Sequence, residues 1–154
     1  MRTIRSPIRL LSVSGEVEHA LELGAAELVS LADAEIVSDF HCREGWSRHG
    51  ERWRGVRLAT LLDRAGARAD GRYVTVASGD YAAVLTRDQA SDPRVLLAVE
   101  HGEHPLERAG GLPRLVGPSD WDCFLSVKSV DRIQLTREPE AATAEAIALA
   151  RLEG

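Results

Sequence analysis

The stretch Asp39–Gly66, "DFHCREGWSRHGERWRGVRLATLLDRAG", gathers most of the residue types that can carry chemistry. It holds one of the two cysteines, two of the three tryptophans, two of the five histidines and several arginines. Cys42 closes an apolar run, where a thiol can serve as a small buried hydrophobe, a nucleophile or a metal ligand. Chemistry alone favours the buried hydrophobe, because no spacing specifies a partner base.

The elements around this thiol follow from local pattern. Glu35–Cys42 is rich in β-forming residues, which predicts a strand that ends at the thiol. In a strand, His41 and Cys42 point to opposite faces. We expect a loop over residues 43–55, and then a helix whose leucines recur at i, i+3 and i+4 before a stop at Gly66.

The rest of the chain reads mainly as short strands with few helices. No repeating strand–helix–strand pattern is present, so we expect an α+β or mainly β fold in a single domain over residues 1–154, with a helical tail at 137–154. The expected elements are two strands around a Ser-Gly turn in Ile8–Leu23, a short helix in 24–32 with Ala25, Leu28 and Val29 on one face, a hairpin around Gly79-Asp80, a helical turn capped by Thr86, a buried strand in 94–102, and a last strand in 126–135.

Composition limits the class of protein. The 154 residues suffice for one domain with a buried core, and the formal net charge of -5 argues against a nucleic-acid partner. Two cysteines make no disulfide framework, which suits a reducing compartment. No signal-peptide pattern and no apolar run of about 20 residues is present, so we expect a cytoplasmic protein without a membrane span. Oligomeric state stays open.

Five blocks, in order along the chain, carry a family resemblance: "CREGWS", "WRGVRLATLL", "YVTVASGDY", "LLAVEHGEHPLERAGGLPRLVGP" and "SVKSVDRIQL". Together they resemble the sulfite-oxidase-type molybdopterin-binding domain, that is, the oxidoreductase molybdopterin-binding domain family. The likeness runs from about Gly15 to Leu135. It implies the α+β sulfite-oxidase molybdopterin-binding fold, with short strands in mixed sheets, and a molybdenum–molybdopterin cofactor.

The resemblance makes Cys42 the protein's ligand to molybdenum. A soft thiolate suits a high-valent metal that changes oxidation state. Ligation removes the thiol proton, which nearby cations favour. The arginines between Arg43 and Arg57 can provide them, although arginines of a solvated loop would look the same.

The resemblance also implies holders for the cofactor's terminal phosphate. In "GGLPRL" it points to Arg114, whose planar guanidinium suits a phosphate. In "SVK" it points to Ser126, Val127 and Lys128, which offer a hydroxyl, a backbone N–H and an ammonium. Ser78 is the further cofactor donor; ordinary turn chemistry explains Ser78 and Ser126 equally well.

With an intact cofactor site, the resemblance implies two-electron oxo transfer on a small sulfite- or sulfoxide-like substrate. Arg43 and Arg48 are the candidates for binding a substrate oxyanion. Tyr81 is a candidate for lining the pocket, or an ordinary strand aromatic. The sequence shows no haem motif, so we expect a separate electron-transfer partner.

Three departures from the family pattern stand out, and the first two motivate another hypothesis, a non-enzymatic binding module with a degenerate cofactor site. Ala109 stands where the family usually has asparagine or histidine; His101 or His104 are the possible substitutes. The N-terminal extension of relatives is not evident. The segment "GPSDWDCFLSVK" brings in Trp121 and Cys123.

A zinc protein is a third hypothesis. His and Cys donors are available, but the spacing typical of zinc sites is absent. The donors are His41, Cys42, His49, His101 and His104.

Overall fold

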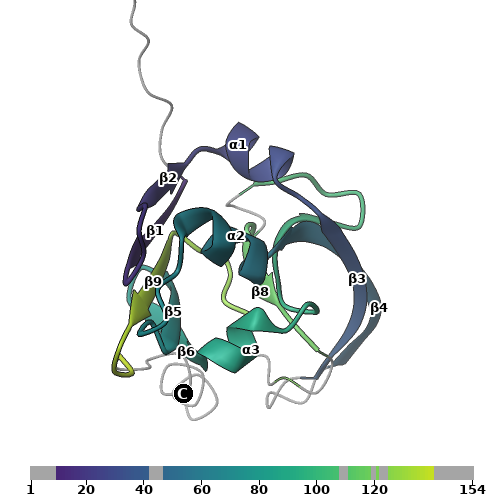
Figure 1. The fold of residues 1–154 in the computed structure, drawn as a ribbon. Coiled ribbons are helices and arrows are strands. Elements are labelled where there is room, and N and C mark those ends of the chain that lie inside the picture. The colour runs from purple at the N-terminus through teal and green to yellow at the C-terminus, as the bar shows by residue number, and fades with distance from the viewer. Residues whose placement is uncertain (1–9, 42–46, 108–110, 119–120, 122–124, 141–154) are drawn as a thin grey trace, which may run out of the picture.

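Two β-sheets face each other across helix α2 (Leu58–Ala65), as Figure 1 shows. The computed structural model describes residues 10–41, 47–107, 111–118, 121 and 125–140, and within these it describes no side chains for 38–41 and 47–49. The strands are β1 (Leu11–Gly15), β2 (Leu21–Leu23), β3 (Ala34–His41), β4 (Ser47–Arg57), β5 (Tyr73–Ser78), β6 (Tyr81–Thr86), β7 (Leu96–His101), β8 (Arg114–Val116) and β9 (Arg132–Thr136); the other helices are α1 (Ala25–Ser30) and α3 (Arg87–Ser91).

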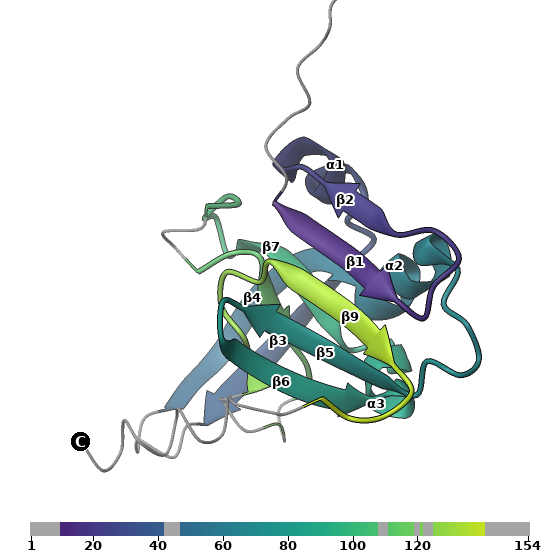
Figure 2. The same ribbon diagram turned by 90° about the vertical axis from the view of Figure 1, so that its left-hand side faces the viewer.

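The larger sheet has the order β2-β1-β9-β5-β6 (Figure 2). β1 and β9 pair in parallel, and the other neighbours are antiparallel. The hairpin expected around Gly79-Asp80 is confirmed, because Ser78 pairs with Tyr81 across the turn. The last strand begins only at Arg132, so residues 126–131 lie in a loop that leads into it.

The smaller sheet has the order β3-β4-β7-β8, and all its pairs are antiparallel. The loop expected over residues 43–55 is wrong from Ser47 onward, because β4 is an eleven-residue strand. β4 pairs with β3 along one edge and with β7 along the other, and its Trp53 side chain is 1% exposed. Pairing with the preceding strand β3 and with the more distant β7 overrides the arginine-rich local composition.

The main core fills the space between the sheets. Helix α2 contributes Leu58 and Leu61, both fully buried, and Gly66 ends the helix in the left-handed conformation (φ 67°), as predicted. In α1 the expected apolar face is wrong, because only Leu28 is buried while Ala25 and Val29 are exposed. The helix has six residues, so a single leucine suffices to anchor it.

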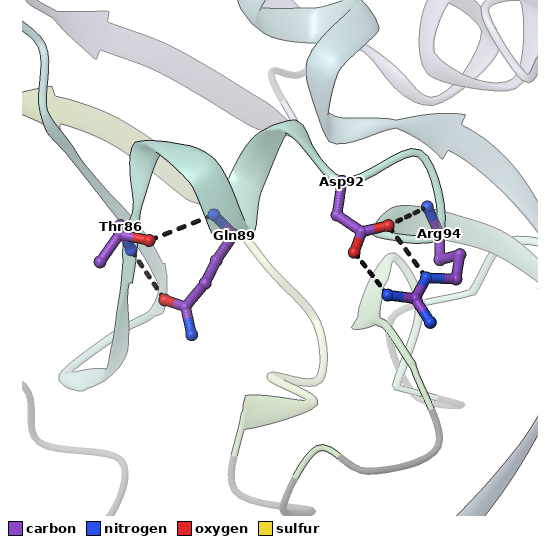
Figure 3. A network of polar contacts seen from close by, with 4 residues as sticks. All are labelled: Thr86, Gln89, Asp92 and Arg94. Atoms are coloured by element: carbon purple, nitrogen blue, oxygen red, sulfur yellow. Dashed lines mark hydrogen bonds and ion pairs between the residues drawn. The ribbon is translucent and has the colours of Figure 1, made fainter.

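Helix α3 and the turn that follows it at residues 92–94 lead the chain into β7, and local hydrogen bonds hold both (Figure 3). Thr86 caps α3 as predicted: its hydroxyl accepts from the Gln89 N–H at 3.1 Å, and the Gln89 side chain accepts from the Thr86 N–H at 2.8 Å. The Asp92 carboxylate then accepts from the backbone N–H, Nε and Nη2 of Arg94. The Arg94 side chain, followed by its backbone N–H, holds the pKa of Asp92 below its ordinary value.

The helical tail predicted for 137–154 lies mostly outside the described residues, which end at 140. No helix in the described part of the chain is long and apolar enough to cross a membrane. The single-domain boundary at 1–154 stays a prediction.

Candidate functional site

Two of the predicted site segments lie side by side. Residues 111–116 carry Arg114, and residues 125–130 carry Ser126 and Lys128. Backbone hydrogen bonds join the segments: the N–H groups of Leu115, Ser129 and Val130 donate to the carbonyls of Val127, Gly111 and Pro113 at 2.9, 2.8 and 2.9 Å. The fold therefore brings together two cation-bearing blocks that the sequence separates.

Gly111 and Ser129 shape the backbone where the two segments meet. Both lie in the left-handed region, with φ of 86° and 52°. A Cβ on Gly111 would lie 3.4 Å from Cδ of Lys128, an ordinary contact distance, so the apolar stem of this lysine lies beside the Gly111 backbone. The Lys128 side chain is exposed and Ser126 is buried.

Arg114 begins β8 and is half-buried. Its Cα pairs with Ala98 of β7, and its guanidinium carbon lies 5.3 Å from the centre of the Trp53 ring on β4. Trp53 in turn stacks on His101, with ring centres 3.9 Å apart. The guanidinium is therefore held over an aromatic surface built by two further strands.

The β5–β6 hairpin is tied to the same region by Asp131. The Asp131 carboxylate accepts from the Gly79 N–H at 3.1 Å, and the Asp131 N–H donates to the carbonyl of Ala77 at 2.9 Å. Ser78 is half-buried between these contacts. Tyr81 is half-buried and packs against the main core, which suits the reading of an ordinary strand aromatic.

Cys42 and Arg43, the predicted metal ligand and substrate contact, lie outside the described residues, and so does Ala109. The backbone of His41, the residue before the thiol, pairs with Ser47 at the end of β3. Along the sheet, Arg114 pairs with Ala98, Ala98 with Gly55 and Gly55 with Ala34, so Arg114 lies level with the start of β3 and His41 lies further along that strand. Arg48 lies on β4, without a described side chain.

The zinc hypothesis gains no support from the described part of the chain. Among these residues no group of three or more His, Cys, Asp or Glu side chains could hold a metal ion. His101 and His104 exchange backbone hydrogen bonds of 3.1 and 2.9 Å across a tight turn, with ring centres 6.2 Å apart. The His101 ring stacks on Trp53, which gives this histidine a structural role. Cys42 and the side chains of His41 and His49 lie outside the description.

Trp53 and Asp131 are site residues that sequence reasoning missed. Each acts through a partner far away in the chain, and the Asp131–Gly79 bond joins residues separated by 52 positions. No local spacing signals such a contact.

Comparison with known proteins now adds a family. Residues 9–144 match the oxidoreductase molybdopterin-binding domain. The chain belongs to this family. The family expected from the sequence is therefore confirmed, and it is a family of molybdopterin oxidoreductases.

Three relatives illustrate the likeness. An uncharacterized oxidoreductase of Bacillus subtilis, YuiH, is 32% identical over 83% of this chain and 65% of that protein. The protein-methionine-sulfoxide reductase catalytic subunit MsrP of Campylobacter jejuni is 29% identical over 90% of this chain and 52% of its own length. A putative protein-methionine-sulfoxide reductase subunit of Azospira oryzae, YedZ1, is 34% identical over 67% of this chain and 39% of its own length. The chain thus spans less than two thirds of each of these relatives.

The fold is confirmed by a solved structure. The crystal structure of the sulfane dehydrogenase SoxCD from Paracoccus pantotrophus matches with a TM-score of 0.77 at 21% identity, over 86% of this chain and 39% of that one. Both the mostly β architecture and its few short helices agree with the expectation.

Proposed function

We propose that this chain is a molybdenum-cofactor-dependent oxidoreductase domain that carries out two-electron oxo transfer on a small sulfite- or sulfoxide-like substrate. Its family and its likeness to a methionine-sulfoxide reductase catalytic subunit support the reaction class. The observation that carries the proposal is the hydrogen-bonded pair of segments bearing Arg114 and Lys128.

The side chains in this pair fit a pterin phosphate. Arg114 supplies a planar fork of N–H donors, Lys128 supplies an ammonium and Ser126 supplies a hydroxyl. Two cations of fixed backbone spacing offset the charge of one phosphate. Gly111 lies beside the Lys128 stem, and its positive φ of 86° favours glycine at this position.

Val127 contributes in a different way from the one expected. Its N–H donates to the carbonyl of Leu125 at 3.0 Å, and its own carbonyl accepts from Leu115. A hydrogen bond from Val127 to a phosphate would have to replace the first of these. We therefore propose that side chains bind the phosphate. Val127, which is fully buried, stabilises the loop.

The metal end of the cofactor is assigned to Cys42, one residue beyond the end of β3. When bound, the cofactor supplies the oxo-transfer chemistry, and the protein supplies position and charge. The Cys42 thiol would give up its proton on ligation, because the thiolate is the form that donates strongly to a metal. Arg43, Arg48 and Tyr81 stay the candidates for contacting substrate, and Ser78 stays a candidate donor to the cofactor.

Two-electron oxo transfer also needs a route for the electrons. The relative MsrP is named a catalytic subunit, which implies at least one further subunit in that protein. We propose a comparable electron-transfer partner for this chain, and the cytoplasmic location stays a prediction.

The test is the content of the purified protein after expression in a host that makes the cofactor. We expect molybdenum and pterin in equal amounts, the pterin detected by its fluorescence after release. Zinc without pterin would contradict the proposal. A folded protein with neither would favour the non-enzymatic binding module.

A further inference from the structure

Behind Arg114 stands a stack of aromatic rings that no family motif assigns to a role. Trp53 is 1% exposed, and its ring lies parallel to that of His101, with an interplanar angle of 8°. His101 Nε2 lies 3.4 Å from Glu51 Oε1. The stack thus joins three side chains from β4 and β7 to the guanidinium of β8.

Strand register explains why these groups meet. Trp53 pairs directly with His101 across β4 and β7, and Arg114 pairs with Ala98 on the other edge of β7. Trp53 also packs with Ala98 in a small apolar cluster of this sheet. The sheet therefore fixes the position of the Trp53 ring, and the start of β8 places Arg114 next to it.

A buried aromatic face changes what the arginine can do. A guanidinium over an indole ring is attracted by the ring quadrupole, and the attraction grows where water is excluded. Contact with the ring also restricts where the guanidinium can lie, before any anion binds. A free arginine side chain would lose rotamer entropy on binding a phosphate, and one already held over a ring has lost part of it beforehand.

We propose that Trp53, supported by His101 and Glu51, is a positioning residue that aims Arg114 at the cofactor phosphate. The inference rests on the proposed function. Trp53 does not touch the phosphate in this account and acts only through Arg114. The competing explanation is that Trp53 merely fills the small cluster, in which case its loss would act equally with or without the arginine.

A double-mutant comparison separates the two explanations. The protein is purified with its cofactor bound, and the rate of pterin release is measured together with the melting temperature. The variants are Trp53→Leu, Trp53→Phe, Arg114→Gln and the double variant Trp53→Leu with Arg114→Gln.

We expect Trp53→Leu to speed pterin release by about threefold to thirtyfold, the factor that a cation–π contact is worth. Trp53→Phe keeps an aromatic face and should recover most of the retention. On the Arg114→Gln background, Trp53→Leu should add less than about twofold, because the contact is already gone.

An equal effect of Trp53→Leu on both backgrounds would overturn the inference, as would release at the wild-type rate. Should Trp53→Leu fail to fold, His101→Leu removes the supporting ring and leaves Trp53 in place. We then expect His101→Leu to speed pterin release by less than Arg114→Gln does, and to add nothing when Arg114→Gln is already present. Pterin release at the wild-type rate in His101→Leu would overturn the inference. If the proposed function is wrong, the wild type carries no pterin, or Arg114→Gln releases pterin at the wild-type rate. Either result would contradict both the proposed function and this inference.

Discussion

At the scale of single residues, the candidate site depends on a few side chains placed by backbone geometry. Lys128 is the only lysine in the sequence. Its stem lies against Gly111, and its ammonium belongs to an exposed side chain. Its chemical reactivity can therefore be followed alone.

A bound phosphate should shield this lysine from an amine-specific acylating reagent. We expect acylation of Lys128 to be several-fold slower in the cofactor-loaded protein than in protein purified from a host that lacks the cofactor. Peptide mass spectrometry measures the extent, and the α-amino group of the chain serves as the internal reference. Equal rates in the two preparations would show that Lys128 does not hold the phosphate.

At the scale of elements, helix α2 depends on a carboxylate from outside the helix. Arg57 precedes the helix without a capping side-chain bond. Asp33 supplies the cap instead: Oδ1 accepts from the Arg57 N–H at 2.9 Å, and Oδ2 accepts from the Thr60 hydroxyl at 2.6 Å. Burial alone would raise the pKa of Asp33, but these bonds and the charge of Arg57 lower it below its ordinary value.

Stability should therefore depend on Asp33 in a defined pH window. A carboxyl with a lowered pKa stabilises the folded state above its unfolded pKa of about 4, and this stability disappears as the pH falls through the folded value. We expect Asp33→Asn to lower the free energy of unfolding by about 1 kcal/mol at pH 7 and by progressively less below pH 4. Urea denaturation across this range measures it, with Asp63→Asn on the exposed side of α2 as the control. A loss of the same size at all pH values would refute the ionised cap.

The contact between β4 and β7 makes a second element-scale prediction. At Gly55 an added Cβ would meet the backbone of Leu97 and the Cα of Ala98, the latter at 2.6 Å. Strand register also shifts between Arg54 and Gly55, next to Trp53. Because backbone cannot swing aside, Gly55→Ala should cost about 1 to 3 kcal/mol of folding free energy.

Gly55→Ala should also speed pterin release, since the strand that carries Trp53 would move. The control is Gly50→Ala on the same strand, where no atom lies within 4 Å of the added Cβ, although φ is 65°. Its cost is backbone strain alone, and pterin release should stay at the wild-type rate. Equal rates of pterin release in the two variants would show that the close backbone contact at Gly55 does not affect the candidate site.

At the scale of the whole molecule, local pattern predicts local structure and little of the assembly. Helix α2, its stop at Gly66 and the β5–β6 hairpin follow from neighbouring residues, and all were predicted. The strand β4 was not, because its pairing with β3 and β7 outweighs an arginine-rich composition. The family blocks located Arg114 and Lys128, whereas the contact of Trp53 with Arg114 exists only after three strands have met.

The central claim is that the sulfur of Cys42 binds molybdenum while Arg114 and Lys128 hold the other end of the cofactor. X-ray absorption at the molybdenum edge counts the sulfur atoms around the metal. We expect Cys42→Ser to lose one sulfur neighbour relative to the wild type and Cys123→Ser to lose none. An unchanged sulfur count in Cys42→Ser, in a folded protein that still holds molybdenum, would contradict the claim.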